Sequence, residues 1–343
     1  MFNFLRKFRR NNSSKYFKYA FGEIILVVIG ILIALSISNW NENRKKRQRT
    51  ETILSQIIEE LKLDIQTFNA LENEFHEKDS LIDVFLQSDF SIASSQNLDS
   101  AEFIDLIRTY IPFQIHNRGF QLLMDHTDEI QDSYAEEVEQ LIILYQDAAG
   151  GIETFMDGLL EVLEEHKKYK YENFDWYAQG SLTLITPDAE YSYYMRNPKY
   201  RNYMAVYREM YFNLVIYTRW FVDLSFQSID DLNDKMGIEN KDTEIFKRVP
   251  LELSQVLSGD FLDSDQNIIK IILKDNKLIN RTFEEFPEEY RANQEQFYVE
   301  ELRYLGDSAF YFNPVYDLKL NADMTLSLTE VFDRSKTLFK KKD

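Results

Sequence analysis

The sequence predicts a membrane-anchored α+β protein, in which one N-terminal transmembrane helix continues into a helical bundle and a small antiparallel β module follows. Three observations support this fold class. Residues 20–38 form an unbroken apolar run, residues 41–237 show helical periodicity, and short β-rich runs replace that periodicity after Val249-Pro250. With 343 residues, 44% of them hydrophobic, the chain is long enough to build more than one hydrophobic core.

The formal net charge of −19 is the sum of two oppositely charged parts. Residues 1–49 hold eleven Lys/Arg and two acidic residues, a net charge of +9. The remaining residues hold 28 basic and 56 acidic side chains, a net charge of −28. The basic part suits an anionic membrane surface, and the acidic part argues against a nucleic-acid partner. The chain has no cysteine, which excludes thiolate zinc sites and cysteine nucleophiles.

The apolar run Ala20–Ser38 reads AFGEIILVVIGILIALSIS and contains one charge, Glu23. As a helix it spans about 28 Å, close to the ~30 Å hydrocarbon core of a bilayer. We therefore predict a transmembrane helix over residues 20–38, preceded by a basic amphipathic segment, residues 1–19, on the cytoplasmic surface. The residues expected to anchor the chain at the membrane surface are Arg6, Lys7, Arg9, Arg10, Lys15 and Trp40.

Two patterns suggest self-association. Gly30, Ala34 and Ser38 form a stripe of small residues on one helix face, which permits close helix packing in lipid. Beyond the membrane, a heptad repeat predicts a long helix that runs to about Ser88, with apolar positions at Leu54, Leu61, Phe68, Phe75 and Ile82 and a second seam at Ile57, Ile65 and Phe85. The heptad helix would either pair with a second copy or pack on the other helices of its own domain.

The helical domain is expected to cover residues 39–240. Residues 129–171 predict one or two helices with a kink at Gly150-Gly151, and Asn197-Pro198 predicts the start of a helix that ends near Met236. Long helices in this order favour an up-down bundle.

The β module is expected to cover residues 250–341. Turns are predicted at residues 275–276 and 321–323. Strands are predicted over residues 267–274, 309–312, 315–320, 324–331 and 337–341. Up to eight short strands at regular spacing would fit in this region, which favours a small sheet or partial barrel.

The segment Lys15–Arg44, KYFKYAFGEIILVVIGILIALSISNWNENR, resembles the opening of a family of uncharacterised bacterial single-span membrane proteins. The shared motif is KYxxYAxGEIxLVVIGILIAL followed by NWNEN, and the resemblance continues more thinly through Leu122–Tyr145 and the run that starts at Asn197. It implies an inner-membrane anchor and a helical soluble domain, and it implies no activity.

A second resemblance covers residues 251–341. Leu257-Ser-Gly-Asp-Phe261, Ile268–Leu273 and Phe310–Phe312 are similar to the accessory β module that follows the catalytic domain of β-lactamase-related serine hydrolases. The catalytic S-x-x-K motif belongs to the domain before that module, which this chain lacks. The resemblance therefore implies an architecture and no catalytic residue.

Candidate chemistry is sparse. No Walker loop, G-x-G-x-x-G, G-x-S-x-G or H-E-x-x-H motif occurs, and no Glu-x-x-His repeat surrounds the four histidines, so we assign no catalytic residue, metal site or cofactor. One tyrosine-rich helical face could form a binding groove for a glycan or peptide, or could belong to the bundle core: Tyr200, Tyr203, Tyr207 and Tyr211, with Arg208 nearby.

These observations favour a non-enzymatic envelope protein anchored in the bacterial inner membrane. Its N-terminus would be cytoplasmic, because moving six basic residues outward is costly, and residues 50–343 would be periplasmic. The expected partners are the lipid bilayer, a second copy of the chain and an unidentified envelope protein. A ligand-binding sensor domain that acts through a partner is the first alternative, and an unrecognised hydrolase is the second.

Overall fold

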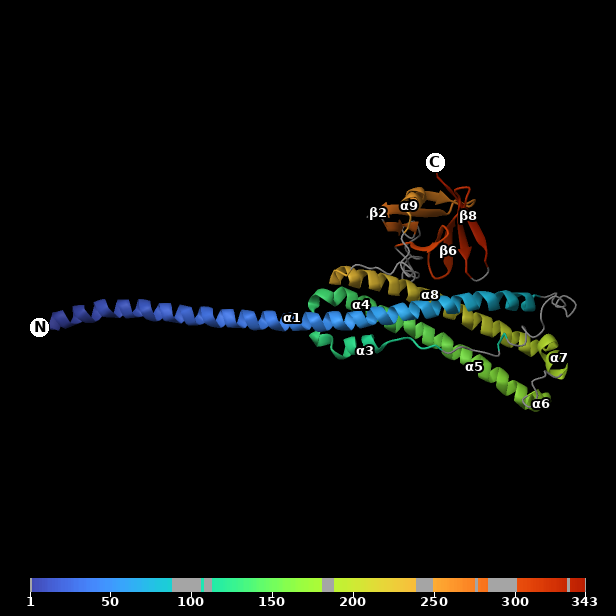
Figure 1. Ribbon diagram of the computed structural model, residues 1–343, viewed down its shortest axis with the longest axis horizontal. Helices are drawn as coiled ribbons and strands as arrows, with labels where there is room; N and C mark the ends of the chain where they lie inside the picture. Colours follow the sequence, from blue (N-terminus) through green and yellow to red (C-terminus); the bar gives the residue numbers. More distant parts are fainter. Residues whose placement is uncertain are drawn as a thin grey trace. The chain divides into compact units, whose positions relative to one another are not determined.

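The computed structural model describes residues 2–87, 106–107, 113–180, 188–238, 249–274, 277–282, 301–331 and 334–342, with side chains described from residue 19 onward except at 179–180. The chain divides into two compact units. Unit 1 comprises Met1–Gln56 and Gly119–Glu136, and unit 2 comprises Ile57–Arg118 and Glu137–Asp343. The first helix, α1 (Phe2–Leu86), contributes to both (Figure 1).

In unit 1, a short returning segment packs on α1. It consists of α3 (Arg118–Asp125) and two 3-10 turns, η2 (Thr127–Glu129) and η3 (Asp132–Tyr134). The backbone N–H of Gln131 donates to the Thr50 hydroxyl at 3.3 Å, and the Tyr134 hydroxyl donates to Glu51 at 3.3 Å. Because Thr50 and Tyr134 are buried, the segment is a packed part of the unit and not a loose connection.

In unit 2, three long helices lie alongside one another: the second part of α1, α5 (Ala149–Asn173) and α8 (Pro198–Met236) (Figure 1). Phe68 of α1 contacts Phe221 of α8, and Phe85 contacts Tyr200, so α1 and α8 run antiparallel. The shorter helical elements of this unit are α4 (Ala135–Ile143), the π-helical turn η4 (Leu144–Ala148), α6 (Trp176–Gly180) and α7 (Asp188–Arg196).

The heptad seam of α1 is buried within the chain. Every seam residue is less than 3% exposed, in the set Leu54, Ile57, Leu61, Ile65, Phe68, Phe75, Ile82 and Phe85. Of the two uses that the heptad pattern left open, the structure shows packing on the chain's own helices. The same period serves both uses because either one buries a single helix face.

The local signals at α8 predicted its ends correctly. The Asn197 side chain accepts hydrogen bonds from the backbone N–H groups of Lys199 (2.8 Å) and Tyr200 (3.4 Å), and Pro198 occupies the first turn, where its missing N–H costs nothing. Gly237 ends the helix with a φ of 68°, a left-handed conformation that glycine adopts without strain.

The predicted kink at Gly150-Gly151 is corrected. The departure from α geometry is the π-helical turn η4, which ends at Ala148, and α5 then continues through both glycines. A Cβ atom at Gly151 would lie 2.0 Å from the Tyr217 ring of α8. Gly151 is thus required for close helix packing, which a sequence pattern cannot distinguish from bending.

The β module begins with α9 (Leu251–Leu257) and forms one eight-stranded antiparallel sheet of order β3-β2-β1-β8-β7-β6-β5-β4. An isolated bridge between Ile279 and Glu301 joins the two edges, so the sheet curls toward a barrel. The strands are β1 (Gly259–Leu262), β2 (Ile268–Lys274), β3 (Lys277–Asn280), β4 (Arg303–Gly306), β5 (Ala309–Tyr311), β6 (Tyr316–Leu320), β7 (Leu326–Glu330) and β8 (Lys336–Lys341).

Alternating apolar residues of the strands fill the inside of this curve. The core includes Phe261, Ile271, Phe310, Leu318 and Phe339, each at most 4% exposed. The five predicted strands correspond to β2, β5, β6, β7 and β8 within a few residues. The sheet has the eight strands that the spacing allowed, but the positions of β1, β3 and β4 were not assigned, because each has only four residues and too little alternation to stand out. The predicted turn at 275–276 lies outside the described residues.

Candidate functional site

The most conspicuous surface of the described chain is the apolar stretch of α1. Its large side chains are all exposed, for example Ile24 at 60% and Leu26 at 71%, and none of its most apolar 18-residue window, with a mean hydropathy of 2.7, is buried. The helix is long and apolar enough to cross a membrane. Gly30 has open space around it, and Trp40 is 62% exposed. The side chains of the other predicted anchors, Arg6 to Lys15, lie outside the described part.

The tyrosine face that the sequence offered as a groove lies in the helix core. Tyr200, Tyr207 and Tyr211 are 0%, 2% and 4% exposed, and burial raises the pKa values of Tyr207 and Tyr211. Tyr203 is half-buried, and Arg208 donates to Asp79 of α1 at 2.6 Å. The structure therefore places Tyr200, Tyr207 and Tyr211 in the helix core, the alternative that the sequence left open, because the same helical spacing produces a core face. Tyr203 instead lies against His166 of α5.

A cluster of aromatic rings surrounds His166 where α5, α7 and α8 meet. The imidazole stacks on Tyr193 with ring centroids 6.0 Å apart and contacts Tyr200 at 5.3 Å and Tyr203 at 5.2 Å. His166 is 3% exposed, and neither its Nε2 atom nor the Tyr193 hydroxyl has a hydrogen-bond partner among the described residues. Burial, assisted by the charge of Lys170, lowers the pKa of His166 to about 3, so the ring is neutral near pH 7.

This neutral imidazole makes the fold acid-sensitive. The pKa of His166 in the folded state lies below its unfolded value of 6.5, so the unfolded state takes up the proton first as the pH falls. The free energy of unfolding therefore decreases as the pH falls below 6.5. We expect His166→Phe to remove about 2 kcal/mol of the stability loss between pH 7 and pH 5. Urea unfolding of the full chain in mild detergent at several pH values measures this. Tyr203→Phe, in the same cluster, should keep the wild-type pH slope, and equal slopes in all three proteins would contradict the assignment.

A network of charges around the buried Arg219 joins the helices to the β module. Arg219 of α8 forms ion pairs with Glu72 of α1 and with Asp317 of β6 (2.5 Å), and its Nε donates to the Pro314 carbonyl at 3.0 Å. In return, the Tyr311 hydroxyl of β5 donates to the Arg219 carbonyl at 3.2 Å. One guanidinium therefore fixes two helices and the β module together.

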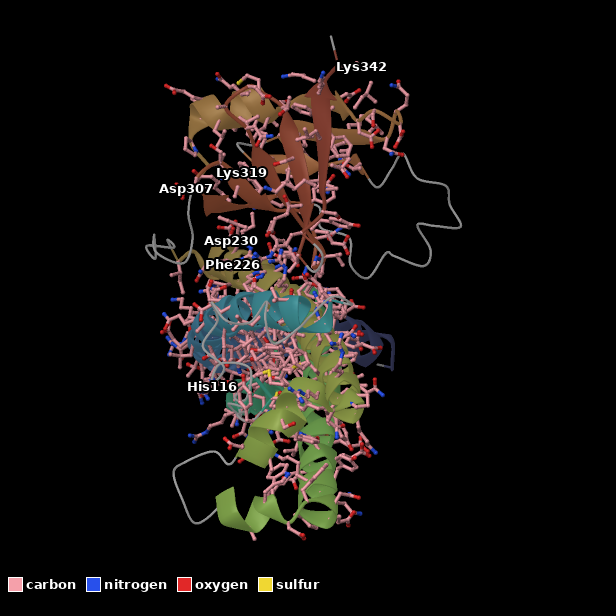
Figure 2. All side chains as sticks on the ribbon, turned by 90° about the vertical axis from the view of Figure 1, so that its right-hand side faces the viewer. His116, Phe226, Asp230, Asp307, Lys319 and Lys342 are labelled. Carbon is pink, nitrogen blue, oxygen red and sulfur yellow. The ribbon has the colours of Figure 1, made fainter. Side chains whose placement is uncertain are left out.

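A second arginine, Arg303 of β4, extends the network. Its Nε lies 3.8 Å from the Asp223 carboxylate of α8, and its guanidinium stacks over the rings of Phe226 (4.4 Å) and Tyr311 (4.7 Å). Beside it, Lys277 of β3 lies 3.9 Å from Asp230. Figure 2 shows Phe226 and Asp230 on the side of α8 that faces the strands.

The electrostatics of the network follow from burial and pairing. Burial raises the pKa of Glu72, but Arg219 and His76 overcome this effect and hold it at about 2. For Asp223, burial wins over the attraction of Arg303 and raises the pKa to about 6. Pairing thus favours the ionised form of Glu72, whereas burial moves the pKa of Asp223 toward neutral pH.

The sequence interpretation missed Arg219, although a signal existed. Arg219 lies on the same helix face as Val215 and Val222, four residues before and three after it, and all three are at most 5% exposed. An arginine in the middle of an apolar helix face needs buried partners, which must come from elsewhere in the chain. Glu72 and Pro314, two partners of Arg219, lie more than 90 residues away along the chain. The sequence pattern therefore indicates that Arg219 has buried partners but does not identify them.

The other histidines have structural contacts. His116 holds the buried Asp64 through its Nδ1 at 2.6 Å and its backbone N–H at 3.1 Å, whereas His76 and His126 lie near Glu72 and Glu129. Burial raises the pKa of Asp64 despite these bonds. Within the described ranges, no three His, Asp or Glu side chains gather as a metal site would require.

Comparisons with known proteins give one match. No curated protein and no solved structure matches the chain. A family model described as a family of unknown function (DUF6090) matches residues 23–109, about a quarter of the chain, which covers the apolar stretch of α1 and the heptad helix beyond it. Over these residues, the chain is similar to an uncharacterised family, and that similarity brings no activity with it.

Proposed function

We propose that this protein is a single-pass protein of the bacterial inner membrane whose folded body binds protein partners or acts as a scaffold and is not an enzyme. One observation carries the proposal: the single helix α1 is fully exposed and apolar over residues 20–38 and fully buried along its heptad seam from Leu54 onward. The same element is therefore suited to be both the anchor and the central helix of the body.

The exposed apolar side chains of residues 20–38 require a nonpolar environment outside the chain. A contiguous exposed apolar patch of this extent is rare on monomeric soluble proteins and marks a membrane or protein contact. Its length matches the hydrocarbon thickness, and aromatic side chains flank it at Tyr19 and Trp40, as expected at both interfaces of a bilayer. A lipid bilayer satisfies all three features together.

The proposed orientation rests on the cost of moving the basic N-terminal segment across the membrane, because the basic residues on the two sides of the span nearly balance. Six basic residues precede the span, and we propose that they stay in the cytoplasm, which places residues 50–343 in the periplasm. The body, residues 50–343, carries a net charge of −28. Because the membrane beside it is also anionic, repulsion disfavours adhesion of the body to the lipid surface.

The decisive experiment is a pair of C-terminal reporter fusions to the full chain. Alkaline phosphatase is active only in the periplasm. Green fluorescent protein fluoresces when it folds in the cytoplasm and stays dark when it is exported unfolded. We expect high phosphatase activity and no fluorescence, with the protein in the pellet after carbonate extraction. The double variant Ile29→Arg/Leu32→Arg should leave the pellet, whereas Leu338→Arg, at an equally exposed position of β8, should not.

Membrane retention of the arginine double variant would contradict anchoring by α1, and fluorescence of the fusion would reverse the orientation. The interaction role is tested by crosslinking intact cells and recovering the full chain. Recovery of the protein free of any crosslinked protein, another copy included, would contradict that role.

The His166 cluster favours a second candidate function, a ligand-binding sensor domain. Two buried polar atoms without a described partner, His166 Nε2 and the Tyr193 hydroxyl, are the kind of groups that a small polar ligand satisfies. Purified full-length protein would then show a rise in melting temperature with an envelope metabolite, and His166→Phe would abolish the rise. No shift across a library of such metabolites would exclude the sensor.

A further inference from the structure

Helix α1 leaves the apolar stretch with five basic residues within six positions: Arg44, Lys45, Lys46, Arg47 and Arg49. At 1.5 Å per residue, Arg44 lies about 9 Å and Arg49 about 16 Å beyond Ser38. Headgroups extend roughly 5–7 Å beyond the hydrocarbon core, and long basic side chains bend back toward them. In a bilayer, the first of these residues would therefore lie at the headgroup layer.

Within unit 1, the turn η2 and its neighbours bind two cations of this basic stretch, Lys46 and Arg49, whereas Arg44 lies over Trp40. Lys46 Nζ donates to the Asp128 carbonyl at 3.3 Å, and Arg49 pairs with Glu129 and lies 2.9 Å from His126 Nε2. The turn η2 and its flanking residues thus hold these two cations. On the other side, Trp40 and Arg44 are one helical turn apart, and the guanidinium lies over the indole ring at 5.6 Å.

We propose that Trp40 and Arg44, with the adjacent exposed Lys45, form a binding site for the headgroup of an anionic phospholipid, and that the turn at Thr127–Glu129 withholds Lys46 and Arg49 from the same headgroups. The inference rests on the proposed membrane anchoring. Lipid is the partner because the site continues directly from the apolar stretch, and a guanidinium with its donor fork matches a phosphate while the neighbouring indole suits the interface.

Glu129 and the lipid headgroups compete for Arg49, and the solvent exposure of the Arg49–Glu129 pair weakens the hold of Glu129. The Arg49 and Glu129 side chains are 46% and 39% exposed, so water screens the pair and the pair can open. A released Arg49 then attracts anionic headgroups across the short distance between them, which is within a Debye length. The turn therefore sets how many cations the helix offers to the membrane: two when the turn is closed, and up to four when it is released.

Fluorescence quenching by brominated lipids tests the proposal on the full chain. The protein is reconstituted in phosphatidylcholine bilayers that contain brominated phosphatidylcholine or brominated phosphatidylglycerol, with the bromines near the carbonyl end of the acyl chain. Of the three tryptophans, Trp176 and Trp220 are only 9% and 6% exposed within unit 2, so quenching reports on Trp40. We expect a relative binding constant about fivefold higher for phosphatidylglycerol.

Two variants separate the parts of the proposal. Arg44→Gln/Lys45→Gln should abolish the preference for phosphatidylglycerol, and Glu129→Gln, which releases Arg49, should increase it. Lys167→Gln, which removes an exposed cation from α5, should leave it unchanged and serves as the matched control. A preference that Glu129→Gln does not alter would overturn the competition with the turn.

The failures of the two proposals are distinguishable. Absence of quenching by either lipid would mean that Trp40 is not beside a bilayer, which overturns the anchoring. Equal quenching by both lipids would preserve the anchoring and overturn the headgroup site. Loss of the preference on addition of inorganic phosphate at constant ionic strength would assign the site to free phosphate and overturn the lipid as its ligand.

Discussion

Replacement of Arg219 by methionine is expected to lower the free energy of unfolding by about 3–5 kcal/mol. The guanidinium is 5% exposed and holds Glu72 of α1 and Asp317 of β6 at once. Methionine has a similar volume and no charge, so the two carboxylates would stay close together without their counter-ion. Most of this loss in the free energy of unfolding comes from leaving the Glu72 and Asp317 carboxylates without a counter-ion, because a buried ion pair itself contributes little net stability.

Urea unfolding of the full chain in mild nonionic detergent measures this effect, since urea leaves ion pairs unscreened. Arg47→Met is the matched control: Arg47 also pairs with a carboxylate, Glu51 at 2.7 Å, but its side chain is 56% exposed, so we expect a much smaller change in the free energy of unfolding. Glu72→Gln in the Arg219→Met background should restore part of the loss. Equal small losses at Arg219 and Arg47 would refute the network's role.

The sequence predicted best what depends on neighbouring residues. The ends of α8 were correct because Asn197-Pro198 and Gly237 each satisfy or permit the local backbone without help from the rest of the chain. The apolar run of α1 was found for the same reason, since its length and composition are properties of one segment. The prediction of strands succeeded where alternation was long enough, as in β6 and β7.

The features that the sequence did not reveal depend on distant partners. The returning segment of unit 1 packs beside Thr50 although about 80 residues separate them, and no local pattern indicates this. Arg219 and His166 could be recognised as polar residues on apolar helix faces, but their surroundings come from other helices and strands. The tyrosine face left both a core and a groove open in the sequence, because spacing alone does not separate the two.

Replacement of Phe221 by alanine is expected to destabilise the fold by about 3–5 kcal/mol, the usual cost of removing a buried aromatic ring from a core that cannot close around the cavity. Phe221 of α8 is 0% exposed and makes edge-to-face contacts with Phe68 of α1 (5.3 Å) and Tyr145 of η4 (6.1 Å). Because Phe68 belongs to the heptad seam, the variant also tests which surface that seam serves.

If the seam packs within the chain, Phe221→Ala lowers the unfolding midpoint by the same amount at every protein concentration. Val206→Ala, on the same helix but 42% exposed, should change the stability by less than about 0.5 kcal/mol. A seam that instead paired two copies would make the midpoint rise with protein concentration and would leave Phe221→Ala close to the wild type. A concentration series in detergent, read together with the stability loss of Phe221→Ala, therefore decides between the two uses of the heptad repeat.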